Sequence, residues 1–190
     1  EKLVAAMAGA SPAARLLLLE QIAAVGSPLG LKTVVEAAHG VDEALRDAAT
    51  RLLGGWMTTD AAPALLELAK TLDDGKYRIR ALRGYVRIAR QLDMTPQQRV
   101  EVCRNTLALA ERVDEKQLAL ETLGRVGSSE ALDLAVSLLA DAQLRAAACA
   151  AVVSVSDRAA VASPEATEKA LTQVLALTSD PATRQQIERQ

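Results

Sequence analysis

Apolar residues recur along the chain at three- and four-residue spacings, with polar residues between them, as in amphipathic helices. Runs that alternate apolar and polar residues, which would indicate strands, are missing from the pattern. The sequence predicts helices at 2–9, 12–25, 29–39, 42–54, 61–72, 76–92, 96–112, 115–126, 129–140, 142–155 and 165–178, with a final piece from 181. The abundance of Ala and Leu supports this assignment. We therefore predict an all-α fold.

Proline and glycine mark the expected helix ends. A capping residue precedes proline in Ser11-Pro12, Ser27-Pro28, Thr95-Pro96, Ser163-Pro164 and Asp180-Pro181, and Pro63 falls in a first turn. We expect left-handed residues to close helices at Gly26, Gly40, Gly54-Gly55, Gly75 and Gly127. Residues 156–163 are expected to form a looser link. Since the other connections are short, successive helices are predicted to be antiparallel neighbours.

Two patterns repeat along the chain. "EQIAAVGSPLGLKTVVEAA" from Glu20 resembles "ETLGRVGSSEALDLAVSLL" from Glu121, and "DEALRDAA" from Asp42 resembles "DAQLRAAA" from Asp141. The arginine of the second pattern has equivalents at positions 15, 46, 80, 119 and 145, where position 119 is Ala. Repetition over a few tens of residues predicts stacked supersecondary units, each of which buries its apolar face against the next.

The Asp-x-x-Leu-Arg-x-x-Ala pattern resembles HEAT repeats, especially the short bacterial variety related to bilin-lyase repeats, over about residues 20–180. The resemblance implies an α-α superhelix of about five stacked antiparallel helix pairs. We expect one such domain over residues 1–190, and we expect a fragment of a longer chain because the pattern is cut at both ends. In this family the Asp helps to close a turn and the Arg joins a ladder between repeats. The resemblance therefore implies structural roles for Asp42, Arg46, Asp141 and Arg145, and for Arg80.

One predicted helix concentrates positive charge. The segment "KYRIRALRGYVRIARQ", residues 76–91, holds six of the 22 Lys and Arg residues and no acid. Projected on a helix, five cations form one stripe opposite a wide apolar face: Lys76, Arg80, Arg83, Arg87 and Arg90. One interpretation is a basic ridge in a concave groove that binds a partner. The other is a set of surface ion pairs with acids at Asp42, Glu43 and Asp47 or at Asp114, Glu115 and Glu121.

Composition limits the function further. The formal charge of −2 argues against a general nucleic-acid binder, and the apolar runs are too short to cross a bilayer. Cys103 and Cys149 lack metal-like spacing and are predicted to be buried free thiols. We expect no cofactor and no metal. The sequence favours the cytoplasm only slightly, and an extracytoplasmic location is open if a signal peptide was removed.

The remaining candidate residues do not form a catalytic set. His39, the one histidine, is expected at a helix end, and Trp56 is expected to fill a turn between repeats. We therefore predict a non-catalytic scaffold that binds another protein or another domain of its own chain. The alternatives are an accessory or regulatory domain of a multidomain enzyme and a bilin-lyase-like enzyme.

Overall fold

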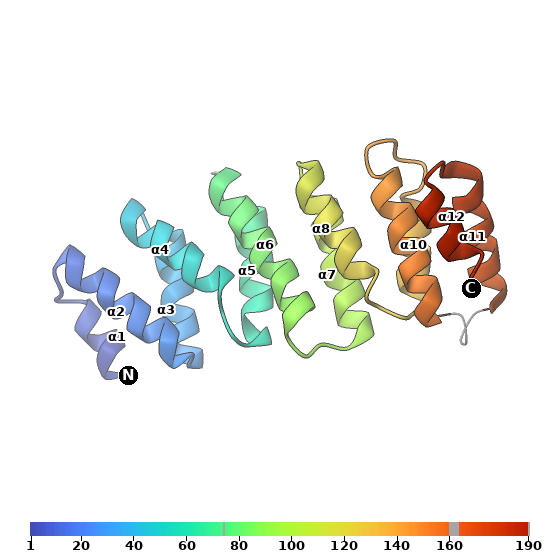
Figure 1. The fold of residues 1–190 in the computed structure, drawn as a ribbon. Coiled ribbons are helices and arrows are strands. Elements are labelled where there is room, and N and C mark those ends of the chain that lie inside the picture. The colour runs from blue at the N-terminus through green and yellow to red at the C-terminus, as the bar shows by residue number, and fades with distance from the viewer. Residues whose placement is uncertain (74, 160–163, 190) are drawn as a thin grey trace. The chain divides into compact units, whose positions relative to one another are not determined.

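The computed structural model describes residues 1–73, 75–159 and 164–189, and this part of the chain is all-helical, with no strand. Figure 1 shows the elements in chain order. They are α1 (Lys2–Met7), α2 (Pro12–Val25), α3 (Pro28–His39), α4 (Glu43–Gly54), a 3-10 turn η1 (Thr59–Ala61), α5 (Ala62–Thr71), α6 (Gly75–Gln91), α7 (Pro96–Leu109), α8 (Val113–Leu123), α9 (Ser129–Ser137), α10 (Arg145–Ala159), α11 (Pro164–Leu177) and α12 (Pro181–Ile187). The predicted all-α class is confirmed.

The helix starts follow the predicted capping chemistry. The hydroxyl of Ser27 accepts a hydrogen bond from Gly30 N at 3.1 Å, just before Pro28 opens α3. At α7 the Thr95 hydroxyl accepts from Gln98 N at 3.2 Å, and the Gln98 side chain accepts from Thr95 N at 2.9 Å. This reciprocal pair is the predicted capping box, and it satisfies two backbone donors that the helix leaves without partners.

The predicted glycine closures are mostly wrong. Gly26 has a φ of 64° and closes α2 in the left-handed conformation, but it is the one positive-φ glycine among the described residues. Gly40 and Gly55 close their helices at φ −67° and −97° by bonding backward to carbonyls one turn earlier. Gly75 is the first residue of α6 and closes no helix. These glycines mark the helix ends without needing a backbone that other residues avoid.

One helix is displaced from its predicted position. The expected helix at 142–155 begins at Arg145, because the Asp141 carboxylate accepts from Gln143 N at 2.8 Å and holds the preceding residues in a turn. The helix continues to Ala159, so the prediction of a loose link is wrong for residues 156–159. Residues 160–163 of that link lie outside the described residues.

The chain divides into two compact units, Glu1–Asp93 and Met94–Gln190, which are described separately. In the first unit, consecutive helices pack as three pairs: α1 with α2, α3 with α4, and α5 with α6 (Figure 1). The second helices of these pairs also contact one another in the order α2, α4, α6. The second unit has the pairs α7–α8 and α9–α10 and the contact order α8, α10, α12, but α11 packs more extensively against α10 than against α12. The prediction that all 190 residues form one domain stays a prediction.

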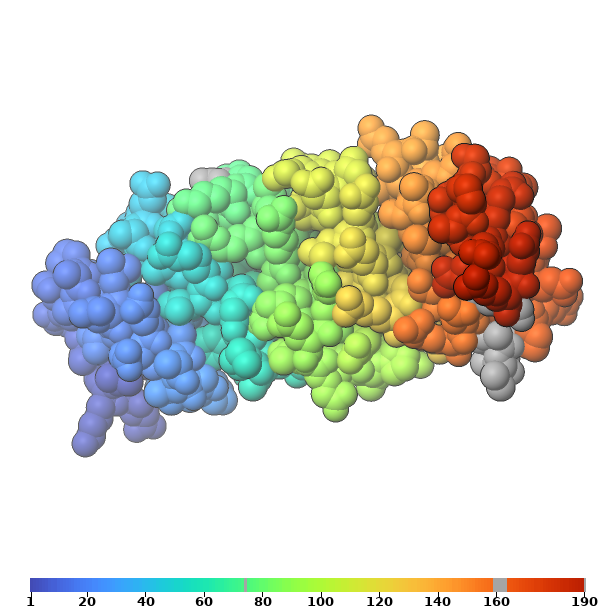
Figure 2. Space-filling model, viewed as in Figure 1, coloured from blue at the N-terminus to red at the C-terminus, as the bar shows by residue number. Residues whose placement is uncertain are grey.

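Small residues bring the second helices of the first unit together. A Cβ added at Gly84 of α6 would lie 2.8 Å from the Cα of Gly54 in α4, and 3.2 Å from a methyl group of Leu65. Only glycine fits a backbone contact this close. The space-filling view shows side chains of the first unit closing the spaces that the ribbon leaves between its helices (Figure 2). This contact sets the neighbouring faces of α4 and α6 beside each other and so positions the charged residues described next.

A charged cluster on the faces of α4 and α6

The helix α6 has the predicted division into an apolar and a basic side. Its buried residues lie on the side that packs against α4 and α5: Tyr77, Ala81, Leu82, Gly84, Tyr85, Val86, Ile88 and Ala89. On the basic side, Lys76 and Arg83 are exposed, whereas Arg80, Arg87 and Arg90 are half-buried. The five predicted cations therefore share a helix face, but they differ in what they contact.

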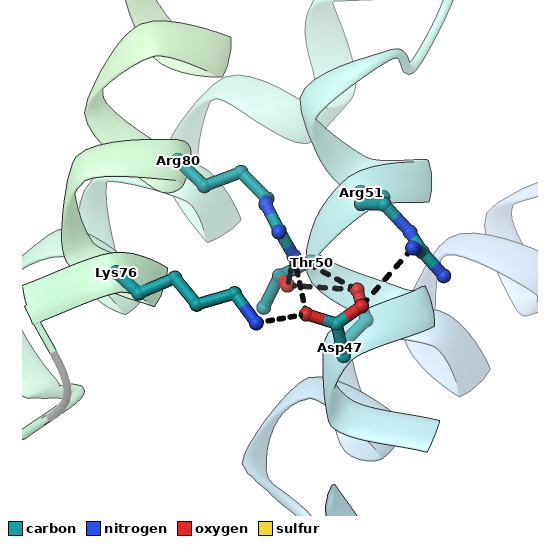
Figure 3. Close-up of polar contacts among 5 residues, drawn as sticks. All are labelled: Asp47, Thr50, Arg51, Lys76 and Arg80. Atoms are coloured by element: carbon teal, nitrogen blue, oxygen red, sulfur yellow. Dashed lines mark hydrogen bonds and ion pairs between the residues drawn. The ribbon is translucent and has the colours of Figure 1, made fainter. Parts of the chain in front are cut away.

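Asp47 of α4 is the acid that gathers these cations. Its Oδ1 lies 2.6 Å from Lys76 Nζ and 3.2 Å from Arg80 Nη1, and its Oδ2 lies 3.1 Å from Nη1 of Arg51. Figure 3 shows the three cations pointing at this carboxylate from α4 and α6. Arg80 Nη1 also donates to the Asp47 carbonyl at 2.9 Å and to the Thr50 hydroxyl at 2.7 Å. Among the acids that the sequence suggested as ion-pair partners of the stripe, Asp47 is the one that forms these ion pairs.

The electrostatics of the cluster follow from these contacts. The hydrogen bond from Lys76, followed by that from Arg80, lowers the pKa of Asp47 below its ordinary value. In turn, the Asp47 carboxylate raises the pKa of Lys76. Both groups are therefore charged at neutral pH.

Arg46, beside Asp47 in the sequence, packs on an aromatic ring. Its guanidinium carbon lies 5.7 Å from the ring centre of Tyr77, and the Lys76 ammonium and Arg80 guanidinium lie 5.1 and 5.7 Å from the same centre. These distances are within the range of cation–π attraction. Tyr77 is 2% exposed, so its ring is a fixed support beneath the three cations.

Arg87 closes the end of α4. Its Nε donates to the Gly54 carbonyl at 2.7 Å, and its Nη2 donates to the Trp56 carbonyl. The last carbonyls of a helix have no partner within the helix, so a guanidinium is well suited to them. Burial lowers the pKa of Arg87. These contacts point into the protein. They occupy donors of Arg87 that an exposed arginine could offer to a binding partner.

The remaining arginine of the predicted stripe, Arg90, is half-buried in the last turn of α6. Within the described residues it makes no hydrogen bond or ion pair. Arg83 is exposed two turns earlier on the same face. Both side chains therefore add positive charge to the face of α6.

The residues of the repeated pattern have two kinds of contact. Asp42 caps α4 by accepting from Leu45 N at 3.1 Å, and Asp141 accepts from Leu144 N at 3.4 Å. The resemblance implied such turn closure by both residues. The arginines differ: Arg80 bridges to the neighbouring α4, while Arg145 Nε donates at 3.1 Å to the Leu139 carbonyl that precedes its own helix. This hydrogen bond of Arg145 thus stays within its own helix pair and does not form a rung of a ladder between repeats.

Sequence reasoning missed three members of the cluster: Thr50, Arg51 and Tyr77. Arg51 follows Asp47 by four residues on a helix, a spacing at which opposite charges meet, so the sequence held a signal for it. Tyr77 lies among cations in "KYRIR", so the sequence also held a signal for its contacts with them. The hydrogen bond from Arg80 to Thr50 depends on how α4 and α6 cross, and nothing in either helix alone predicts it.

Other candidates have structural surroundings. Trp56 is 3% exposed, and its indole Nε1 donates to the Thr58 hydroxyl at 3.0 Å, so it fills the turn after α4 as predicted. Cys103 and Cys149 are buried and free, also as predicted. His39 is exposed at the end of α3. A search of the described part of the chain found no group of His, Cys, Asp and Glu that could hold a metal ion.

Comparison with known proteins adds no family. Searches against protein-family models and against curated proteins found no match to this chain. Within the described residues, every helix is too short or too polar to cross a membrane.

Proposed function

We propose that this chain is a protein-interaction scaffold built from HEAT-like repeats. In this proposal the helix pairs form an α-α superhelix whose second helices line a concave surface. The basic face of α6 then lies in the groove, where it binds an acidic segment of another protein or of another domain of the same chain. The repeated Asp-x-x-Leu-Arg pattern and the packing of successive second helices within each unit support this architecture.

The observation that carries the proposal is the charge balance around Asp47. One carboxylate is shared by Lys76, Arg80 and Arg51, so the single negative charge of Asp47 balances only one of these three positive charges. The side chains of Lys76 and Arg51 are 57% and 63% exposed, and therefore this excess charge faces solvent. Arg83 and Arg90 extend the same charge along α6. The ion pairs thus reduce the basic character of the face without removing it.

An acidic protein segment suits this face better than a nucleic acid does. Nucleic-acid affinity grows with the number of phosphates contacted, and domains that bind it are usually basic as a whole. Here the cations gather on α4 and α6, while the whole chain has a formal charge of −2. The surrounding acids would repel a long polyanion, whereas a short acidic segment could contact the cluster alone.

Binding of a fluorescein-labelled decaglutamate peptide, followed by fluorescence anisotropy at low salt, tests the proposal. The double variant Arg83→Gln/Arg90→Gln removes two cations that lie outside the Asp47 contacts and should weaken binding several-fold. Arg87 is left intact because its loss would disturb the end of α4. The matched control Arg104→Gln/Lys169→Gln removes two exposed cations from the second unit.

The expected result is weaker binding by the α6 variant and unchanged binding by the control, with equal melting temperatures. A variant with Asp47→Asn should bind the peptide more tightly, because it removes the negative charge that Lys76, Arg80 and Arg51 share. Equal affinity in wild type and the Arg83→Gln/Arg90→Gln variant, or binding of decalysine in place of decaglutamate, would refute the basic face as the interaction site.

A further inference from the structure

We infer that Arg46, together with Lys76 and Arg80, forms a discrete oxyanion site on Tyr77 that takes a phosphate monoester carried by the bound segment. The inference rests on the proposed function, because it specifies the chemistry of the same face. It also gives Arg46 a binding role, where the family resemblance implied only a structural one.

The hydrogen-bonding capacity of Arg46 is unused. A guanidinium has five N–H donors in a planar fork. In the described part of the chain, none of these donors meets an acceptor, and the Nε is buried without a partner. Asp42 lies one turn earlier, but its carboxylate caps α4 and forms no ion pair with Arg46 among the described residues. Because Arg46 is only half-buried, the outer edge of its guanidinium is open to a ligand.

The position of Arg46 is nevertheless fixed. Its guanidinium packs at 5.7 Å from the centre of the buried Tyr77 ring. A guanidinium that packs against an aromatic ring keeps its N–H edge available for a bidentate contact with phosphate or carboxylate. Lys76 and Arg80 approach the same ring, at 5.1 and 5.7 Å, and both touch the same oxygen of Asp47, so they lie next to each other. Three cations therefore lie between 5.1 and 5.7 Å from the centre of one buried ring.

The charge of the site favours a phosphate monoester over a single carboxylate. Arg46 adds a fourth cation to Lys76, Arg80 and Arg51, which share the carboxylate of Asp47. A phosphate monoester has a charge of about −1.5 to −2 at neutral pH and three acceptor oxygens, whereas a carboxylate has one charge and two oxygens. A dianion with three acceptor oxygens therefore satisfies the donors of Arg46, Lys76 and Arg80 more fully than a carboxylate with two oxygens does.

Other arginines of the repeated pattern provide the contrast. Arg15 in α2 also has a buried Nε without a partner, but within the described residues it has no aromatic ring in cation–π contact. Arg145 directs its Nε to the Leu139 carbonyl at 3.1 Å. Of these three positions, only Arg46 combines unused donors, an aromatic support and neighbouring cations.

The test compares three labelled peptides that differ at one central residue, phosphoserine, glutamate or serine, in an otherwise acidic sequence. Wild-type protein should bind the phosphoserine peptide about tenfold more tightly than the glutamate peptide, as expected for one or two added charge-assisted hydrogen bonds. Arg46→Gln should remove this preference, and Arg46→Lys should restore only part of it because an ammonium cannot form the bidentate contact. Arg15→Gln, the matched control, should keep the full preference.

The outcomes separate this inference from the proposed function. Binding of all three acidic peptides without a preference for phosphoserine would overturn the oxyanion site and leave the acidic-segment proposal standing. A preference that survives Arg46→Gln, or that Arg15→Gln removes equally, would also overturn it. Failure of every acidic peptide to bind would refute both. Melting temperatures of the variants, and their affinity for the serine peptide, show whether a lost preference reflects lost folding.

Discussion

The contact between α4 and α6 in the first unit and the contact between α8 and α10 in the second unit use different chemistry for the same purpose. Each joins the second helices of successive pairs. In the first, Arg80 reaches across to Asp47 and Thr50 with hydrogen bonds. In the second, the equivalent position is Ala119, which is fully buried. There, a Cβ added at Gly124 would lie 3.3 Å from Ser154 and 3.6 Å from the Cα of Ala151.

The difference shows that the arginine of the repeated pattern is not needed for stacking. What both contacts share is a glycine, Gly84 within α6 and Gly124 directly after the end of α8, that lets the neighbouring helix approach. The close approach is common to both contacts, whereas the hydrogen bonds of Arg80 to Asp47 and Thr50 belong to the contact in the first unit. The cations gathered around Asp47 are the basis of the functional proposal.

Placing an arginine at the buried alanine of the second unit should produce the largest change in stability. Ala119→Arg places a long charged side chain at a fully buried position in the core of the second unit, which has no space for it. We expect a loss of more than about 3 kcal/mol in the free energy of unfolding, or failure to fold. Urea denaturation followed by circular dichroism measures it.

The reciprocal change is the control for this experiment. Arg80→Ala removes hydrogen bonds from a side chain that is 24% exposed, so it should cost only about 1–2 kcal/mol. If Ala119→Arg were tolerated as well as Arg80→Ala, the contrast between the two contacts would be wrong.

A methyl group at the close contact of the first unit should have the next largest effect. Gly84→Ala places a Cβ 2.8 Å from the Cα of Gly54, which is backbone and cannot rotate away. Since α4 and α6 would have to separate, we expect a loss of about 1–3 kcal/mol in the free energy of unfolding. Gly75→Ala is the matched control, because its added methyl would meet nothing within 4 Å. Equal stability of the two variants would show that the helices are not held together at Gly84.

Local patterns predicted most of the fold. The twelve helices lie within a few residues of the expected positions, because capping residues such as Ser27 and Thr95 act within one turn of themselves. The errors have local causes too: Asp141 holds a turn that periodicity extended into helix, and Gly40 closes α3 without a positive φ. The division into two compact units was not predicted, since the connection at residues 93–95 is as short as the other connections between the predicted helices.

The candidate site was predictable in composition but not in geometry. The stripe on α6 and the acid Asp47 could be read from charge and helical periodicity. The different contacts of Arg87 and Arg80 could not, since both depend on the crossing of α6 with α4. The packing of Arg46 on Tyr77 likewise joins residues from separate helices. Tertiary contacts of this kind leave no periodic signal in one helix.

Alkaline pH should weaken the second unit through Cys103. Burial raises the pKa of this thiol from 9.0 to about 12. A group with a raised folded pKa keeps its proton when the unfolded chain loses it, so stability falls as pH rises above 9. We expect roughly 1 kcal/mol lost per pH unit up to about pH 12. Urea unfolding at pH 7 and 10 should show this loss in wild type and a smaller one in Cys103→Ala. Cys149→Ala should change it less, because Arg145 offsets part of the effect of burial on the pKa of that thiol.

Acid pH should weaken the first unit through Asp47, with the smallest effect because this cluster reaches solvent. Its pKa is lowered from 3.8, first by the hydrogen bond from Lys76. A carboxyl group with a lowered folded pKa stabilises the fold above its ordinary pKa, and the contribution disappears as pH falls through the folded value. The melting temperatures of wild type and Asp47→Asn should therefore differ at pH 7 and converge below the folded pKa. Lys76→Ala should show a weaker acid dependence than wild type, because it removes the largest cause of the shift. A difference in melting temperature between wild type and Asp47→Asn that is the same at every pH would mean that Asp47 acts through packing. The contact between α4 and α6 would then not depend on the charge of Asp47.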